Sequence, residues 1–96
     1  MAGGAVPDRV PRLPRGVRLH DDRVRACRVL LGPERALMLD EVGAAILDEV
    51  DGMQSLSVIS ARLAARYLAP EAEIRADVEV FLTDLAERRL VEWSDA

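Results

Sequence analysis

Residues 35–52 of this 96-residue chain have the pattern of a strand that passes directly into a helix. The apolar run 36–39 ends at Asp40, whose carboxylate can accept backbone N–H groups from the first turn of a helix. Apolar residues then recur at spacings of three or four positions, as they do on one helical face: Leu39, Val42, Ile46 and Val50. Gly52 can end that helix in the left-handed conformation. The pattern therefore predicts a strand that leads directly into a helix over 41–50.

Two further strands are predicted before this transition. Apolar and polar residues alternate over 17–20, and the apolar-rich run 24–31 indicates a second strand. An acidic pair at 21–22 and a Gly-Pro pair at 32–33 supply the turns between the strands. With 35–39 as the third strand, we expect an antiparallel meander whose last strand lies at an edge, where its backbone donors and acceptors are unpaired.

Two further helices are predicted after the transition. Ser57 is the expected N-cap of a helix over 58–67, and Pro70 can open a helix over 70–89 at the position where its missing N–H costs nothing. An apolar stripe marks the core side of this last helix: Ile74, Val78, Phe81, Leu82 and Leu85. The segment 90–93 then returns in an extended form. This order predicts an α+β fold, winged helix-turn-helix-like, in which a three-stranded antiparallel sheet is followed by three helices.

The length of the chain allows one domain. Residues 1–14 are rich in glycine and proline and show no periodicity, so we expect a flexible N-terminal tail before a single domain over 15–93. No apolar run approaches the roughly 20 residues that cross a bilayer. The N-terminal arginines are not followed by the apolar segment of a secretory signal. These patterns favour a cytoplasmic protein with no membrane partner.

Charge is distributed unevenly along the chain. Residues 1–35 carry eight arginines and four acids, a net charge of +4, whereas residues 36–96 carry five arginines and thirteen acids, a net charge of -8. A winged helix that enters DNA needs a basic recognition helix, because phosphate contacts dominate affinity. The predicted helix over 70–89 holds three arginines and six acids, so we expect no nucleic-acid partner. DNA binding through Arg62 and Arg66 of the middle helix is an alternative.

The sequence contains no recognisable catalytic constellation. His20 is the only histidine, and Cys27 is the only cysteine, which excludes an internal disulfide and a cysteine-based metal cluster. There is no HExxH motif and no glycine-rich phosphate loop. Adjacent carboxylates lie where caps and turns are expected. We therefore predict a protein that is not an enzyme and that uses no cofactor and no metal.

Peptide or protein recognition is the function class that these exclusions leave. An extended peptide can add to an edge strand, with backbone hydrogen bonds for affinity and side-chain pockets for selectivity. The strand over 35–39 would form one wall of such a groove, and the helix over 70–89 the other. Two alternatives are that the chain's own tail covers this edge, or that a second copy pairs with it in a homodimer.

Three stretches of the sequence resemble the PqqD family, small accessory proteins of pyrroloquinoline quinone (PQQ) biosynthesis. They are VLLGPERALMLDEVGAAILDEVDG over 29–52, ISARLAARY over 59–67, and the spacing PE…I…DV…FL…L…LVE over 70–92. The most specific part is the Pro-Glu-Arg turn that leads through the third strand into the Asp-capped helix. The similarity covers about residues 14–92, most of the chain.

The resemblance implies a non-enzymatic peptide chaperone that binds the precursor peptide PqqA and presents it to the radical SAM enzyme PqqE. It also implies that the leader of the peptide adds as a strand beside the third strand and lies against the third helix. The positions that match this contact region are Arg35, Ala36, Leu37, Met38, Leu39, Arg75, Val78, Glu79 and Leu82. Because the same fold serves other modified-peptide pathways, leader binding in another such pathway is the alternative.

Overall fold

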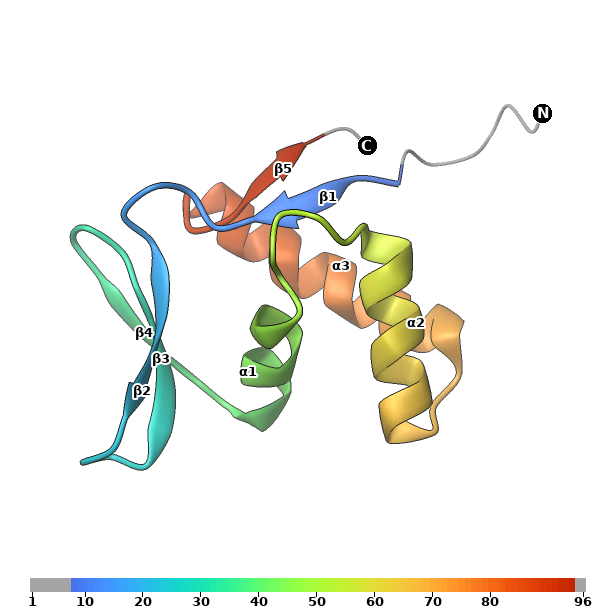
Figure 1. Ribbon diagram of the computed structural model, residues 1–96, viewed down its shortest axis with the longest axis horizontal. Helices are drawn as coiled ribbons and strands as arrows, with labels where there is room; N and C mark the ends of the chain where they lie inside the picture. Colours follow the sequence, from blue (N-terminus) through green and yellow to red (C-terminus); the bar gives the residue numbers. More distant parts are fainter. Residues whose placement is uncertain (1–7, 95–96) are drawn as a thin grey trace.

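The computed structural model describes residues 8–94 of the chain. Its elements are β1 (Val10–Arg12), β2 (Arg18–Asp22), β3 (Cys27–Leu31), β4 (Ala36–Leu39), α1 (Glu41–Asp48), α2 (Leu56–Tyr67), α3 (Glu71–Glu87) and β5 (Glu92–Ser94). The molecule is elongated: the sheet of β2, β3 and β4 stands at one end, and α2 lies at the other, beyond α1 (Figure 1). This arrangement confirms the predicted α+β class, with a three-stranded sheet followed by three helices.

The three-stranded sheet is an antiparallel meander with the strand order β2-β3-β4. Asp22 stabilises the turn after β2, because its carboxylate accepts hydrogen bonds from two backbone N–H groups of that turn, at 3.1 and 3.2 Å. The observed β3 is shorter than the predicted strand over 24–31, since 23–26 form the turn and Ala26 takes a positive φ of 56°. β4 lies at one edge of the sheet, as the sequence predicted.

A second sheet, which the sequence did not predict, pairs segments from the two ends of the described chain. β1 runs antiparallel to β5, with Pro11 opposite Trp93. Val10 is 8% exposed and the side chain of Pro11 is fully buried, so both belong to the folded domain. The expectation of a tail over 1–14 therefore fails for β1, and residues 1–7 lie outside the described residues. A proline can occupy such a strand because only alternate N–H groups face the partner strand.

α1 begins where the sequence predicted and ends earlier. The Asp40 carboxylate accepts a hydrogen bond from the Gly43 N–H at 2.7 Å, which confirms Asp40 as the N-cap. The helix ends before Val50, and Gly52 takes its positive φ of 79° in the following turn. The buried face also differs from the predicted stripe, because Val42 is 59% exposed. The buried residues of α1 are Gly43, Ala44, Ala45, Ile46 and Leu47.

The N-caps of α2 and α3 differ from the predicted positions. The hydroxyl of Ser55, rather than that of Ser57, accepts the hydrogen bond from the Val58 N–H at 3.3 Å. Ser57 lies inside the helix, and its own N–H donates to Asp8 at 2.9 Å. Pro70 is the N-cap of α3 and not its first residue. Two serines two positions apart give the same local signal, so the sequence could not choose between them.

The core lies between the inner face of the three-stranded sheet and the helices. Leu30 of β3 is 0% exposed and belongs to one hydrophobic cluster with residues of all three helices. The predicted stripe of α3 is confirmed for the members that are buried: Val78, Leu82 and Leu85. Ile74 and Phe81 are half-buried against the same cluster. Among residues 8–94, no helix is long and apolar enough to cross a membrane.

Candidate functional site

β4 has an open edge, and the hairpin geometry determines which of its backbone groups face outwards. The Gly32 N–H donates to the Arg35 carbonyl oxygen at 2.8 Å across the β3–β4 turn. Hydrogen-bonded and non-hydrogen-bonded pairs alternate along an antiparallel ladder, so Leu37 also faces β3 with its N–H and C=O. Ala36 and Met38 direct theirs away from β3. No strand within residues 8–94 pairs with this edge, which leaves these groups available to an added strand.

The side chains of β4 divide between the two faces of the sheet. Leu37 is half-buried against the core and Leu39 is 9% exposed, so these two side chains hold the strand on the domain. Met38 lies on the other face and is 61% exposed, and its sulfur accepts a hydrogen bond from Nη1 of Arg25 at 3.7 Å. Ala36 is exposed on the same face. The predicted strand residues therefore lie together on one accessible edge.

The predicted contact residues on α3 have other partners in the structure. Val78 and Leu82 are 2% and 0% exposed and belong to the core. Arg75 donates a hydrogen bond from Nη1 to the hydroxyl of Ser57 in the first turn of α2, on the far side of α1 from the sheet (Figure 1). Glu79 lines a shallow hollow that is formed by α3 itself. Arg75 and Glu79 thus lie, respectively, against α2 and on the exposed side of α3, whereas Val78 and Leu82 share the hydrophobic core cluster of Leu39.

A different stripe of α3 lies next to the first turn of α1. Phe81 packs over Gly43, where a Cβ atom would lie 3.1 Å from the ring Cζ. Arg88, about two turns further along the same helix face, borders a cavity of about 270 Å³ beside the β3–β4 turn. This cavity is lined by Pro33, Glu34, Arg35, Arg88, Arg89 and Leu90. The glycine inside a helical pattern was the sequence signal for such a close approach, because glycine is otherwise unfavourable there.

An apolar pocket of about 210 Å³ lies between the three helices, beyond the C-terminal end of β4. It is lined by Val42, Ala45, Ile46, Leu63, Tyr67, Ile74, Asp77 and Val78. Val42 and Tyr67 are 59% and 47% exposed, so part of this lining is open to solvent. A mostly apolar pocket with a single carboxylate at its wall suits an apolar side chain.

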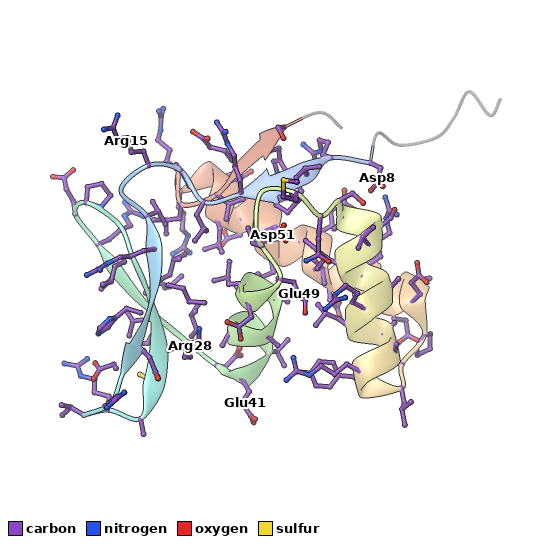
Figure 2. The ribbon with its side chains drawn as sticks, viewed as in Figure 1. Asp8, Arg15, Arg28, Glu41, Glu49 and Asp51 are labelled. Carbon is purple, nitrogen blue, oxygen red and sulfur yellow. The ribbon has the colours of Figure 1, made fainter. Side chains whose placement is uncertain are left out.

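An ion pair fixes the three-stranded sheet relative to α1. Arg28 of β3, which Figure 2 labels, donates from Nη1 and Nη2 to the two carboxylate oxygens of Asp48, at 3.2 and 2.8 Å. The hydrogen bonds to Asp48 raise the pKa of Arg28, while burial opposes this change. Two parallel N–H···O bonds add geometric specificity to the charge attraction. The pair therefore helps to hold β4, the neighbour of β3, in a defined position relative to the helices.

Residues 8–94 contain no assembled metal site, and the groups that they leave available for binding are the backbone groups of β4. No group of three or more His, Cys, Asp or Glu side chains converges within residues 8–94. His20 is exposed on β2, and Cys27 is a half-buried free thiol at the start of β3. The open edge of β4 can bind an extended chain through backbone hydrogen bonds. Phe81 of α3 lies against the first turn of α1, and Arg88, the C-cap of α3, lines the cavity beside the β3–β4 turn.

Comparison with known proteins shows similarity over the region that contains this edge. The sequence profile described as Coenzyme PQQ synthesis protein D (PqqD) matches residues 27–91. The protein named PqqA binding protein of Rhizobium meliloti is 46% identical over 83 residues, which cover 86% of this chain and 85% of that protein. Both β4 and α3 lie within the matched residues.

Two solved structures are similar to this one. The first is the solution NMR structure of the PqqD truncation of Methylobacterium extorquens PqqCD, described as a functional and stand-alone recognition element for ribosomally synthesised and post-translationally modified peptides. It is 48% identical, with a TM-score of 0.76, and the match covers 86% of this chain and 88% of that one. The second is the crystal structure of PqqD from Xanthomonas campestris, at 44% identity and a TM-score of 0.57, with coverage of 81% and 87%.

Proposed function

Because this chain belongs to the PqqD family, we propose that it binds the precursor peptide PqqA in PQQ synthesis and carries out no chemistry itself. The observation that carries this proposal is the open edge of β4, where Ala36 and Met38 present backbone N–H and C=O groups. Pairing with such an edge suits an extended peptide, because the backbone supplies affinity whatever the side chains are. The name of the Rhizobium meliloti relative and the description of the Methylobacterium extorquens structure support it.

The peptide-binding surface that we propose combines β4 with the stripe of α3 that contains Phe81 and Arg88. The strand residues are those expected from the sequence, Arg35 to Leu39. On the helix we assign contact to Phe81 and Arg88 in place of Arg75 and Glu79. Val78 and Leu82 act indirectly, by packing α3 into the core. An added strand at β4 would then lie between the sheet and this helix.

Presentation of the bound peptide to a radical SAM enzyme of the PqqE kind is the further step that we propose, and it rests on the family resemblance. A peptide made by the ribosome is first available in the cytoplasm, so we place the protein there.

We also propose that the folded domain begins near Asp8, because Asp8, Arg9 and β1 contact the body of the protein. Leader binding in another modified-peptide pathway is the alternative, supported by the description of the Methylobacterium extorquens structure as a recognition element for ribosomally synthesised and post-translationally modified peptides.

A backbone-amide NMR titration of the full chain with synthetic PqqA tests the proposal. We expect shifts at β4 and at Phe81 and Arg88. Met38→Pro removes an N–H that faces the open edge, and edge strands tolerate proline, so the fold should persist while affinity falls by about tenfold or more. Met38→Ala is the matched control, because it shortens the side chain and keeps the N–H.

Two results would contradict the proposal. One is a set of shifts that leaves out β4; the other is equal affinity of folded Met38→Pro and Met38→Ala for the peptide. Sedimentation equilibrium without peptide shows whether a second copy occupies the edge. Duplex DNA binding that weakens steeply with salt would favour the nucleic-acid alternative instead.

A further inference from the structure

Arginines surround the cavity between the β3–β4 turn and the C-terminal end of α3. Its lining includes Arg35, Arg88 and Arg89, and Glu34 is the single acid among the lining residues. Arg88 pairs with Asp84 at 3.3 Å. Within residues 8–94, neither Arg35 nor Arg89 forms an ion pair. The cavity thus carries positive charge that the described part of the chain does not neutralise.

The backbone holds these arginines close to one another. A Cβ atom on Gly32 would lie 2.8 Å from Cδ2 of Leu90, and Leu90 is 2% exposed, so the turn is packed tightly against the end of α3. Arg89 takes a positive φ of 64°, and the chain reverses there so that the Leu90 N–H donates to the Leu85 carbonyl oxygen at 2.8 Å. Backbone packing therefore fixes the positions from which these arginine side chains extend.

The cavity lies on the side of β4 to which alternate residues of an added strand would point. Residues two apart on a strand share a face, and residues opposite each other across a pair share it too. Arg35 therefore shares the face of Leu37, which packs against the core. A peptide residue opposite Arg35 would direct its side chain toward the cavity. The residue two positions away would face Leu37 and the apolar interior.

The other end of the β4 edge has the opposite charge. β4 is followed directly by Asp40 and Glu41, and Asp77 lines the apolar pocket beyond them. A carboxylate on a bound peptide is attracted to the Arg35 end and repelled from the Asp40 end. The charges along the edge therefore favour one placement of an acidic peptide residue.

We propose that Arg35, Arg88 and Arg89 form a carboxylate-binding site for an acidic side chain of the bound peptide. That side chain lies two positions from an apolar one that faces Leu37. Guanidinium groups suit this role because they donate several N–H groups in a planar arrangement that matches a carboxylate. The inference rests on the proposed addition of the peptide to β4, and it adds the chemistry that would set register and direction.

Affinity measurements on the full chain with synthetic PqqA test the site. Arg35→Gln and Arg89→Gln are each expected to weaken binding by about three- to tenfold, and the double variant by more. Arg23→Gln, at the exposed β2–β3 turn, removes the same charge far from the cavity and is the matched control. Each acidic residue of the peptide is replaced in turn by its amide. One replacement should weaken binding to the native chain and have little effect on binding to the double variant.

The outcomes separate this inference from the proposed function. If the double variant binds like Arg23→Gln while Met38→Pro loses affinity, strand addition stands and the carboxylate site is wrong. If the double variant binds weakly but no single peptide acid accounts for it, the arginines act only through net charge, and the site is again wrong. If Met38→Pro binds normally, the proposed function itself fails. Amide spectra of each variant confirm that the fold is retained.

Discussion

Asp8 accepts a hydrogen bond from the backbone N–H of Ser57, 49 residues further along the chain, at 2.9 Å. The neighbouring carbonyl oxygen of Arg9 accepts a hydrogen bond from the Leu56 N–H at 2.8 Å. These are N–H groups that the first turn of a helix leaves unpaired. Asp8 and Arg9 therefore complete the N-terminus of a helix that is distant in sequence, and Figure 2 shows Asp8 beside the start of that helix.

The pKa of Asp8 gives this contact a measurable pH dependence. Burial raises that pKa, but hydrogen bonds from the Ser57 N–H and from the hydroxyls of Ser55 and Ser57, with the charge of Arg75, outweigh burial and leave it below 3.8. A carboxyl group with a lower pKa in the folded state stabilises the fold above the unfolded-state pKa. That stabilisation is lost as the pH falls through the folded-state pKa.

Asp8→Asn is therefore expected to be less stable than the native chain at neutral pH, by up to about 1 kcal/mol, and equally stable once Asp8 is protonated. Urea unfolding of both chains as the pH is lowered from neutral checks this. A difference in the free energy of unfolding that stays constant across the acid range would show that the charge of Asp8 plays no part.

Gly43→Ala is expected to destabilise the protein despite the better helix propensity of alanine. The new Cβ would lie 3.1 Å from Cζ of Phe81 and 3.2 Å from Oδ1 of Asp40. Alanine gains about 1 kcal/mol in a helix, and overpacking costs about 1–3 kcal/mol, so we expect a net loss. In a Phe81→Leu background the same substitution should cost less, because the ring is gone. Thermal unfolding of the four chains gives this coupling, and additive effects would refute it.

Leu82→Ala distinguishes a core residue from a peptide contact. Because Leu82 is 0% exposed, its truncation is expected to lower the free energy of unfolding by about 2–5 kcal/mol. The affinity of the folded fraction for PqqA should not change. Chemical unfolding and peptide titration at a temperature where the variant is folded measure the two effects separately. A loss of affinity for PqqA without a loss of stability would show that Leu82 contacts the peptide.

Leu68→Gly is expected to stabilise the protein by up to about 1 kcal/mol, because glycine avoids the steric cost of the left-handed conformation. Leu68 ends α2 at φ 54° and is 92% exposed, so the substitution removes little packing. Ala69→Gly, one position further on and without a positive φ, is the control and should be destabilising. Unfolding midpoints that fall for both variants would show that Leu68 is not strained.

Local sequence patterns predicted those parts of the fold whose causes lie within a few residues of one another. Asp40 caps the first turn of the helix that directly follows it, and the acidic and Gly-Pro turns connect strands that are adjacent in sequence. These features could therefore be predicted. They also place β4 at the end of a meander, which is why the edge could be predicted as a binding surface. The predicted cap Ser57 was wrong and Ser55 is the cap, because the two serines carry the same local signal.

Tertiary structure alone decided which side chains accompany that edge. β1 pairs with β5 although Val10 and Ser94 are 84 residues apart, a contact that no local pattern encodes. The stripe of α3 that faces the first turn of α1 depends on how Phe81 packs over Gly43, and an apolar stripe in the sequence does not say which neighbour each side chain meets. Packing between distant segments places Arg88 near Arg35 and turns Arg75 toward α2, because side-chain direction follows from the rotation of the helix against its neighbours.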